Sequence, residues 1–268
     1  MPKTVGIIAG NGVYPPTFAK AARKAGVEKL VAAGFTGETD AGLEELVDAT
    51  SWFRVGQLSK MIQFFQSEGV TQAVMVGQIA PRNLFDLRPD MRTLMLLGKL
   101  KEKNAESIFR GIAGELEKDG ITLLPATTFL DDHLAPAGHI CGPKPEKQIL
   151  RDAEFGLRIA KEVSALDIGQ TVVVRNGTVL AVEAFEGTNE AIRRGGKIGK
   201  GKAVLVKVSK PDQDMRFDVP VIGPATLETA AEAGLKGIVI EAGRTLILGR
   251  EEIEAIATES GIAVVGVG

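Results

Sequence analysis

The chain alternates between short runs that are apolar throughout and longer stretches in which apolar residues recur every three or four positions. TVGIIAG at 4–10 and QAVMVG at 72–77 are apolar on both faces, as is typical of buried parallel strands. The stretch 58–65 instead places its apolar residues on one side of a helix, and Gly69 ends it. This alternation through the first 130 residues predicts a parallel sheet covered by helices on both faces.

The second half shows a different pattern at its beginning. Two β-rich runs, TVVVR and TVLAVEA, flank Asn176-Gly177, which predicts a hairpin with a type I′ turn. Later apolar runs alternate with helical patterns that end at glycine. The fold prediction is α/β: a Rossmann-like parallel-sheet domain over 1–130 and an α+β domain over 149–268. Residues 131–148 hold three prolines and two glycines and are predicted to be the linker.

Composition narrows the classes of function. The 268 residues carry 32 Lys and Arg against 34 Asp and Glu, so the net charge of −2 gives no reason to expect nucleic-acid binding. A single cysteine, Cys141, excludes an internal disulfide and a multi-cysteine zinc site. We see neither a signal peptide nor an apolar run of membrane-spanning length, and we expect a cytoplasmic protein.

Two glycine-containing turns follow predicted strands. Gly10-Asn11-Gly12 precedes a helix, and Gly77-Gln78 lies at a carboxyl end, where open α/β sheets bind their ligands. Phosphate or nucleotide contact and simple chain reversal are both compatible with the first turn. It lacks the G-x-G-x-x-G pattern of dinucleotide folds, and the next strand lacks the acid that would bind a ribose. Arg82 and Arg88, in the loop after Gln78, are either phosphate ligands or exposed side chains.

The segment 207–226 concentrates charge in a stretch that its prolines keep out of a regular helix or central strand. It carries Lys207, Lys210, Asp214, Arg216 and Asp218. Two carboxylates four residues apart, with an arginine between them, suit a divalent metal and a phosphate, because Mg²⁺ takes carboxylate oxygens and Arg and Lys take phosphate oxygens. A polar turn with surface ion pairs is the alternative interpretation.

Other positions stay open on sequence alone. The apolar stretch 91–100 is either core or the lining of a groove for an apolar ligand. Thr188 is placed to cap the helix TNEAIRRGG. The acids at the ends of predicted elements would form one site only if the fold brings them together; they are Glu183, Glu186, Asp214, Asp218 and Glu241.

Three long segments carry a resemblance to a known family. They are GIIAGNGVYP at 6–15, LDIGQTVVVRNGTVLAVEAFEGTNEAIRRGG at 166–196, and KVSKPDQDMRFDVPVIGPAT at 207–226. On these motifs the chain resembles, from its N-terminus to its last strand, the LpxI family of UDP-2,3-diacylglucosamine pyrophosphatases of lipid A synthesis. The resemblance implies a two-domain enzyme with substrate held between the domains. It also implies Mg²⁺-dependent hydrolysis of a pyrophosphate to UMP and 2,3-diacylglucosamine 1-phosphate.

The resemblance also implies roles for particular residues. Asp214 and Asp218, with Glu186, are the expected Mg²⁺ ligands, and Asp214 is the one we favour as most critical. Arg216 and Lys210 are expected to stabilise charge on the phosphates. The resemblance implies substrate binding by Gly10, Gly12, Thr188 and Gln213, and to these we add Asn11, Gly77 and Gln78 because they lie in the two turns that follow predicted strands.

The chain departs from the family pattern at two places. Asn11 and Tyr14 stand in the first turn, which in the family more often reads GGG followed by Leu-Pro, and Asn189 stands where an aspartate usually follows the EGT motif. If that aspartate binds metal, Asn189 keeps an oxygen ligand but loses its charge.

The expected partner is a lipid-linked sugar nucleotide, with peripheral contact at the inner membrane and, by family analogy, a homodimer. Two alternatives follow from the same residues. One is a non-catalytic sugar-nucleotide or lipid-binding protein in which Asn189 marks lost chemistry. The other is a nicotinamide-dependent oxidoreductase on the N-terminal sheet, against which the missing ribose-binding acid counts.

Overall fold

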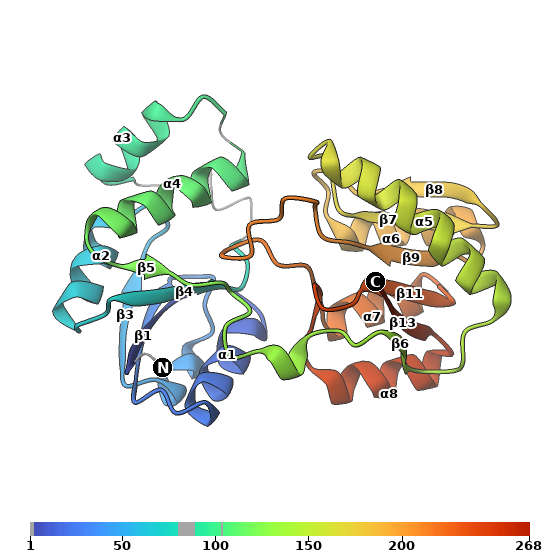
Figure 1. The fold of residues 1–268 in the computed structure, drawn as a ribbon, viewed down its shortest axis with the longest axis horizontal. Coiled ribbons are helices and arrows are strands. Elements are labelled where there is room, and N and C mark those ends of the chain that lie inside the picture. Colours follow the sequence, from blue (N-terminus) through green and yellow to red (C-terminus); the bar gives the residue numbers. More distant parts are fainter. Residues whose placement is uncertain (1–2, 80–88, 103) are drawn as a thin grey trace. The chain divides into compact units, whose positions relative to one another are not determined.

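The structure is a computed structural model that describes residues 3–79, 89–102 and 104–268. It divides into two compact units (Figure 1), each considered separately below. Unit 1 comprises Met1–Asp131 together with Asp214–Asp218, and unit 2 comprises Asp132–Gln213 and Val219–Gly268. Both units alternate helices with strands, so the predicted α/β class is confirmed.

Within the described residues, unit 1 is built on a five-stranded sheet in the order β3-β2-β1-β4-β5. Every neighbouring pair is parallel, as the doubly apolar strand patterns predict. The order reverses between β1 and β4, so the loops that follow these two strands lead to opposite halves of the sheet. The strands are β1 (Thr4–Ala9), β2 (Lys29–Phe35), β3 (Ala49–Phe53), β4 (Gln72–Val76) and β5 (Thr122–Leu123).

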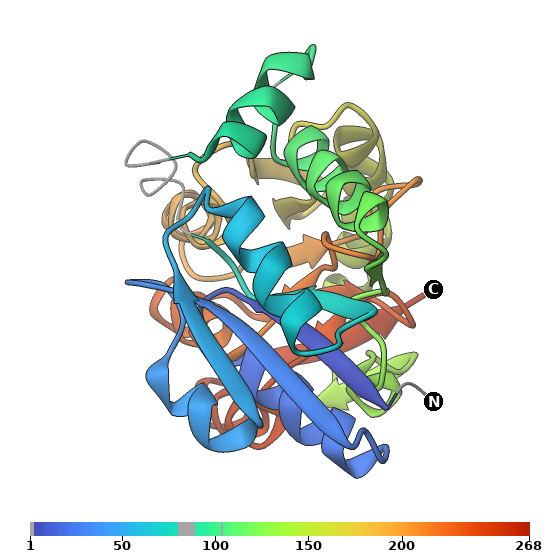
Figure 2. The same ribbon diagram turned by 90° about the vertical axis from the view of Figure 1, so that its left-hand side faces the viewer.

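Helices cover both faces of this sheet. One face packs against α2 and α4 through a core that includes Ile62, Phe65 and Leu116, and Figure 2 shows α2 (cyan) lying over the blue strands. The predicted helix end at Gly69 is confirmed, because this residue has a positive φ. Asn104 is the N-cap of α4 and accepts a hydrogen bond from the Ser107 N–H at 2.9 Å. The elements are α1 (Tyr14–Lys24), η1 (Ala41–Leu46), α2 (Leu58–Ser67), α3 (Met91–Lys99) and α4 (Ala105–Lys118).

Unit 2 contains a six-stranded mixed sheet in the order β6-β13-β11-β9-β7-β8. The three central strands are parallel, and β6, β7 and β8 each run antiparallel to their neighbours. A separate parallel pair joins β10 (Val221–Ile222) to β12 (Leu246–Ile247). The large sheet consists of β6 (Gly138–Cys141), β7 (Thr171–Arg175), β8 (Thr178–Val182), β9 (Val204–Lys207), β11 (Gly237–Glu241) and β13 (Ala263–Val267).

The helices of unit 2 divide between the two faces of its sheet (Figure 1). The residues of α5 pack against one face, and those of α6, α7 and α8 contribute to the core on the other. Helices and strands therefore alternate along the chain here too, rather than being segregated as in an α+β domain. The helices are α5 (Lys147–Ala165), α6 (Thr188–Gly199), α7 (Pro224–Glu232) and α8 (Arg250–Ser260), and η3 (Asp131–His133) is a short 3₁₀ helix at the unit boundary.

The predicted hairpin is confirmed, and the predicted linker differs from the structure. Asn176 and Gly177 have φ of 49° and 68°, as a type I′ turn requires, and join the antiparallel strands β7 and β8. Residues 131–148 are not only a connection, because β6 within them pairs with β13. Four residues are enough for an edge strand, and the prolines lie outside them.

The apolar stretch 91–100 folds as α3, but most of it is not core. Leu96 is buried, whereas Met91, Leu94 and Met95 are exposed by 70%, 49% and 55%. Asp90 caps this helix by accepting the Thr93 N–H at 2.9 Å. In the parts of the chain described here, none of the helices has both the length and the apolar content that crossing a bilayer requires.

Candidate functional site

At the carboxyl end of the unit 1 sheet, the structure brings together the two predicted glycine turns. The Gly10 N–H donates to Val76 O at 2.8 Å and the Asn11 N–H donates to Gln78 O at 2.7 Å. A Cβ at Gly10 would lie 2.5 Å from Gln78 O, and one at Gly77 would lie 2.7 Å from Asn11 O. Close approach of the two loops therefore requires both glycines, whether or not a ligand is bound.

The turn after β1 offers fewer anion-binding donors than its sequence indicates. Pro15 and Pro16 follow Tyr14 in the first turn of α1 and have no N–H, so this helix end lacks two of its usual free donors. The Asn11 side chain donates to Glu38 Oε2 at 2.7 Å, which brings a carboxylate to the turn. Gly12, with a φ of 83° and open space around it, is the part of the turn that stays free of close contacts. Arg82 and Arg88 lie outside the described residues.

A buried polar network lies at the carboxyl end of the parallel strands of unit 2, on the face covered by α6. The Lys207 ammonium donates to Thr188 Oγ1 at 2.9 Å, and the Thr188 hydroxyl donates to Glu183 Oε1 at 2.7 Å. Lys207 and Glu183 are only 6% and 9% exposed. The predicted cap was wrong: Gly187 is the N-cap of α6, and the Thr188 hydroxyl instead joins two buried charges.

The same network extends across three adjacent strands. Lys207 and Thr171 are register partners, and the Glu183 N–H donates to Thr171 O at 2.9 Å. Glu183 Oε2 and Thr171 Oγ1 are buried without a hydrogen-bond partner among the described residues. Such atoms normally bind an ordered water or a ligand group. Sequence analysis placed Glu183 and Lys207 near the ends of predicted strands, but it assigned neither residue a role in binding or catalysis.

A second network lies at the end of β11, on the face covered by α5. Glu241 accepts hydrogen bonds from Lys161 Nζ at 2.8 and 2.7 Å, and from the Ser209 N–H and hydroxyl at 2.9 and 2.8 Å. Arg244 Nη1 donates to Ser209 Oγ at 3.1 Å. Burial alone would raise the pKa of Glu241, but the bonds from Lys161 and Ser209 outweigh it and hold that pKa below its usual range. This network anchors the loop that follows β9.

Lys210 and Gln213 are held together in that loop. The Lys210 N–H donates to Gln213 Oε1 at 2.6 Å, and the Lys210 ammonium forms an ion pair with Asp167. Asp167 follows the C-terminal end of α5 and has a positive φ. The cationic group expected to contact phosphate is therefore already paired with a carboxylate.

Glu186 lies in the exposed loop between β8 and α6. Its Oε1 accepts from Arg194 at 2.5 Å, and its Oε2 accepts from the Ala184 N–H at 3.2 Å. Its own backbone N–H and the Arg194 guanidinium lower the pKa of Glu186. Asn189, the departure from the family pattern, is half-buried in the first turn of α6.

Asp214 and Arg216 form a two-point ion pair in unit 1. Arg216 donates through Nε to Asp214 Oδ1 at 3.0 Å and through Nη2 to Oδ2 at 2.8 Å. These hydrogen bonds lower the pKa of Asp214, so its carboxyl is ionised at neutral pH. Arg216 Nη1 also lies 3.6 Å from Glu117 Oε1 of α4.

The segment 214–218 forms a single turn that packs on unit 1. The Asp218 N–H donates to Asp214 O at 3.1 Å, which separates the two carboxylates by one turn of chain. The Ala126 N–H donates to Met215 O at 2.7 Å, and the ring of Phe217 lies 5.7 Å from that of Phe109. The segment is thus held by backbone and aromatic contacts as well as by charge.

The predicted metal ligands are divided between the units. Asp214 and Asp218 belong to unit 1, and Glu186 belongs to unit 2. Among the residues that the structure describes, no group of three or more His, Cys, Asp or Glu side chains is arranged to hold a metal ion. The donor chemistry of Asp214 suits Mg²⁺ nonetheless, because its carboxylate is ionised and its Oδ2, which accepts one hydrogen bond from Arg216 where Oδ1 accepts two, keeps a lone pair.

Comparison with known proteins matches both halves of the chain. The model of the LpxI N-terminal domain matches residues 4–133, and that of the LpxI C-terminal domain matches residues 136–265. The UDP-2,3-diacylglucosamine pyrophosphatase LpxI of Caulobacter vibrioides is 33% identical over 276 residues, covering 99% of this chain and 98% of that protein.

Two solved structures are distantly similar to the chain. The biotin carboxylase domain of Hydrogenobacter thermophilus 2-oxoglutarate carboxylase is 18% identical, with a TM-score of 0.29 over 66% of this chain and 36% of its own. The biotin carboxylase subunit of pyruvate carboxylase is 15% identical, with a TM-score of 0.28 over 74% of this chain and 42% of its own. Neither similarity bears on fold or function.

Proposed function

Because the chain belongs to the LpxI family, we propose that it hydrolyses the pyrophosphate bond of UDP-2,3-diacylglucosamine, releasing UMP and 2,3-diacylglucosamine 1-phosphate. The observation that carries the proposal is the similarity along almost the whole chain to a relative named for this substrate. The two domain models also match in the expected order, because the N-terminal domain model matches the first half of the chain and the C-terminal domain model matches the second.

The charged side chains of the site suit this chemistry. A pyrophosphate resists hydrolysis because its anionic oxygens repel an incoming nucleophile. Arg216 and Lys210 are assigned to neutralise that charge and to stabilise the phosphate that leaves. Each is paired with an aspartate in the structure, Arg216 with Asp214 and Lys210 with Asp167, and these pairs keep both cations oriented until substrate competes for them.

We assign Mg²⁺ binding to Asp214 and Asp218, whose carboxylates are separated by one turn of the chain. When bound, the ion would neutralise phosphate charge and acidify a water molecule. Arg216 orients Asp214 through both carboxylate oxygens and keeps it ionised. Glu186 is assigned to the same role, with Arg194 holding its carboxylate in the exposed loop before α6.

The buried network of unit 2 supports a phosphate-binding role for the amino end of α6. Gly187 precedes this helix without a side-chain cap, so its first-turn N–H groups stay available to an anion. Thr188 holds the buried ammonium of Lys207 at the same helix end. Thr188, assigned to substrate from the family motif, thereby acquires a physical role as the group that positions a cation.

The decisive experiment measures UMP release from the diacylated sugar nucleotide with and without Mg²⁺. Asp214→Asn should lower turnover about a hundredfold or more, because removing one charge-stabilising group typically costs that much. Asp212→Asn is the matched control, because it removes a nearby exposed carboxylate that has no assigned role. Normal turnover in folded Asp214→Asn protein would remove Asp214 from the mechanism.

Asn189 motivates a second candidate, a binding protein of the same fold that does not hydrolyse its ligand. Tight binding of the sugar nucleotide without UMP release, at any Mg²⁺ concentration, would favour this candidate. Asn189→Asp restores the charge that the family usually has there. Under the enzyme proposal, this change should lower the Mg²⁺ concentration that gives half-maximal turnover.

A lipid-linked substrate implies work at a bilayer surface. We place the protein in the cytoplasm with peripheral contact at the inner membrane, and we assign that contact to the exposed apolar side chains of α3. A homodimer remains a prediction from family analogy, measurable by sedimentation.

A further inference from the structure

A cavity of about 330 Å³ opens in unit 2 at the amino ends of the parallel strands. The residues assigned to substrate in this unit lie at the opposite, carboxyl ends. The cavity is lined by the first residues of β9 and β13, Val204 and Ala263, and by Arg175 at the end of the antiparallel strand β7. Glu183, Thr188 and Lys210 lie beyond the other ends of these strands. A space of this size accommodates a small metabolite.

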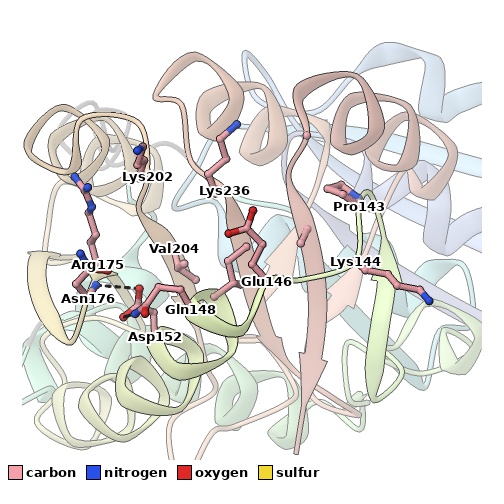
Figure 3. A pocket seen from close by; sticks show the side chains of 13 residues that line it. Pro143, Lys144, Glu146, Gln148, Asp152, Arg175, Asn176, Lys202, Val204 and Lys236 are labelled. Carbon is pink, nitrogen blue, oxygen red and sulfur yellow. Dashed lines mark hydrogen bonds between the residues drawn. The ribbon is translucent and has the colours of Figure 1, made fainter.

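Positive charge predominates in the lining. Lys144, Arg175, Lys202 and Lys236 are among its lining residues, and Figure 3 shows that the Lys144 side chain extends away from the other three. None of the four forms an ion pair with another residue in the described part of the chain, and Arg175 donates through Nη1 to the backbone oxygen of Gly199 at 2.7 Å. Because the whole chain has a net charge of −2, this concentration of unpaired cations is local.

The two acids in the lining do not cancel this charge. Asp152 is 2% exposed, and its oxygens accept the N–H groups of Asn176 and Gly177 at 2.9 Å, so it serves the hairpin turn. Figure 3 shows Asp152 beside Asn176. Glu146 is exposed at the N-cap of α5 and makes no side-chain capping bond. Counting four cations against two acids leaves the lining with a charge of +2.

The amino end of α5 adds to the positive field. Glu146, Gln148 and Ile149 line the cavity, and the first hydrogen bond of the helix runs from Leu150 N–H to Glu146 O. The N–H groups of residues 147–149 therefore have no partner within the helix. A helix of 19 residues also directs the positive end of its dipole there.

We propose that this cavity is a second anion site of the protein, which binds a small phosphate ester carrying two negative charges. Lys202 and Lys236, with Arg175, bind the phosphate oxygens, and the apolar side chain of Ile149, which is 8% exposed, contacts the rest of the molecule. The lining residues include no aromatic ring, so recognition is through the phosphate and not through stacking on a base. This inference does not rest on the proposed hydrolysis.

The test is a titration of the full-length protein with inorganic phosphate and with glycerol phosphate, at constant ionic strength set with KCl. We expect saturable binding by calorimetry, with a dissociation constant on the order of 1 mM. Amide chemical shifts should change at Gln148 and Ile149. Lys202→Gln with Lys236→Gln should weaken binding about tenfold, because two charge-assisted contacts are lost.

The control is Lys147→Gln with Lys197→Gln, which removes two exposed lysines of the same unit whose side chains do not line the cavity. It should change affinity less than about twofold. Equal weakening in both double variants, shift changes confined to residues 186–188, or no saturation at about 20 mM ligand would each overturn the proposal. The UMP-release assay is independent of all three outcomes.

Discussion

Thr188 connects two oppositely charged side chains of unit 2, because a threonine hydroxyl accepts one hydrogen bond and donates another. Lys207 and Glu183 are only 6% and 9% exposed, so bulk solvent has little access to these bonds. Glu241 is held in the same way on the other face of the sheet by Lys161 and Ser209. At the scale of single residues, the carboxyl end of this sheet therefore depends on hydrogen bonds to buried or half-buried charges.

Replacing Thr188 with valine keeps its shape but removes both hydrogen bonds. We expect unit 2 to lose about 1–3 kcal/mol of stability, because Lys207 and Glu183 are left unsatisfied. Thr188→Ser, which keeps the hydroxyl, should stay closer to the wild type. Hydrogen exchange of the β7 and β9 amides measures the difference, and equal protection in the two variants would contradict the network.

The lowered pKa of Glu241 predicts a pH dependence of stability. A carboxyl whose pKa is lower in the folded state stabilises the protein above the unfolded value of about 4.3, and this contribution is lost as the pH falls through the folded value. Glu241→Gln should therefore cost about 2 kcal/mol at pH 7 and progressively less below about pH 4. Thermal unfolding across this range tests the prediction, and a difference that does not change with pH would refute it.

At the scale of elements, α3 and β6 show that local pattern does not determine environment. The residues of α3 are apolar enough for a core helix, yet three of its large side chains face solvent. Residues 138–141 lie among prolines and glycines, yet they form an edge strand because β13 offers free backbone groups for pairing. The Asn176-Gly177 hairpin is the opposite case, because its turn residues alone impose the required φ values.

The exposed face of α3 predicts binding to a bilayer surface. Replacing Met91, Leu94 and Met95 together with glutamine should lower co-sedimentation with anionic lipid vesicles about tenfold or more, because exposed apolar area drives such binding. Leu166→Gln with Ile198→Gln removes exposed apolar side chains of unit 2 and serves as the control. If both variants bind vesicles like the wild type, α3 is not the membrane contact.

At the scale of the whole molecule, the path of the chain determines which unit holds residues 214–218. Residues 214–218 come from the second half of the sequence but are part of unit 1. Phe217 packs against the core cluster of that unit, and Met215 O accepts a bond from Ala126. Asp214 and Asp218, two of the residues assigned to Mg²⁺, therefore depend on the folding of unit 1 as well as on their own loop.

Phe217→Ala should destabilise unit 1 by about 2–3 kcal/mol. This is at or below the smallest cost usually measured for replacing a buried phenylalanine with alanine, because the Phe217 ring is only half-buried. Hydrogen exchange should show the loss in α4, the helix that carries Phe109, and not in the strands of unit 2. Phe185→Ala, which truncates a side chain that is 90% exposed, should change neither. A loss confined to unit 2 would count against the assignment of this segment.

The sequence alone determined the features that depend on neighbouring residues. Apolar periodicity gave the parallel strands and amphipathic helices, Asn176-Gly177 gave the hairpin, and the long motifs gave the family. The strands, helices and hairpin follow from backbone preference or from residues a few positions apart, and the motifs are read directly from the order of the residues, so no knowledge of the fold is needed.

Tertiary structure decided what depends on distant approach. The loop contacts that require Gly10 and Gly77, the bond between Lys207 and Thr188, and the place of Phe217 in unit 1 join residues far apart in the chain. The sequence alone does not distinguish a charged residue that will be buried from one that will be exposed. Only the packing of strands and helices around it fixes its partners and its degree of exposure, and these govern what it can bind.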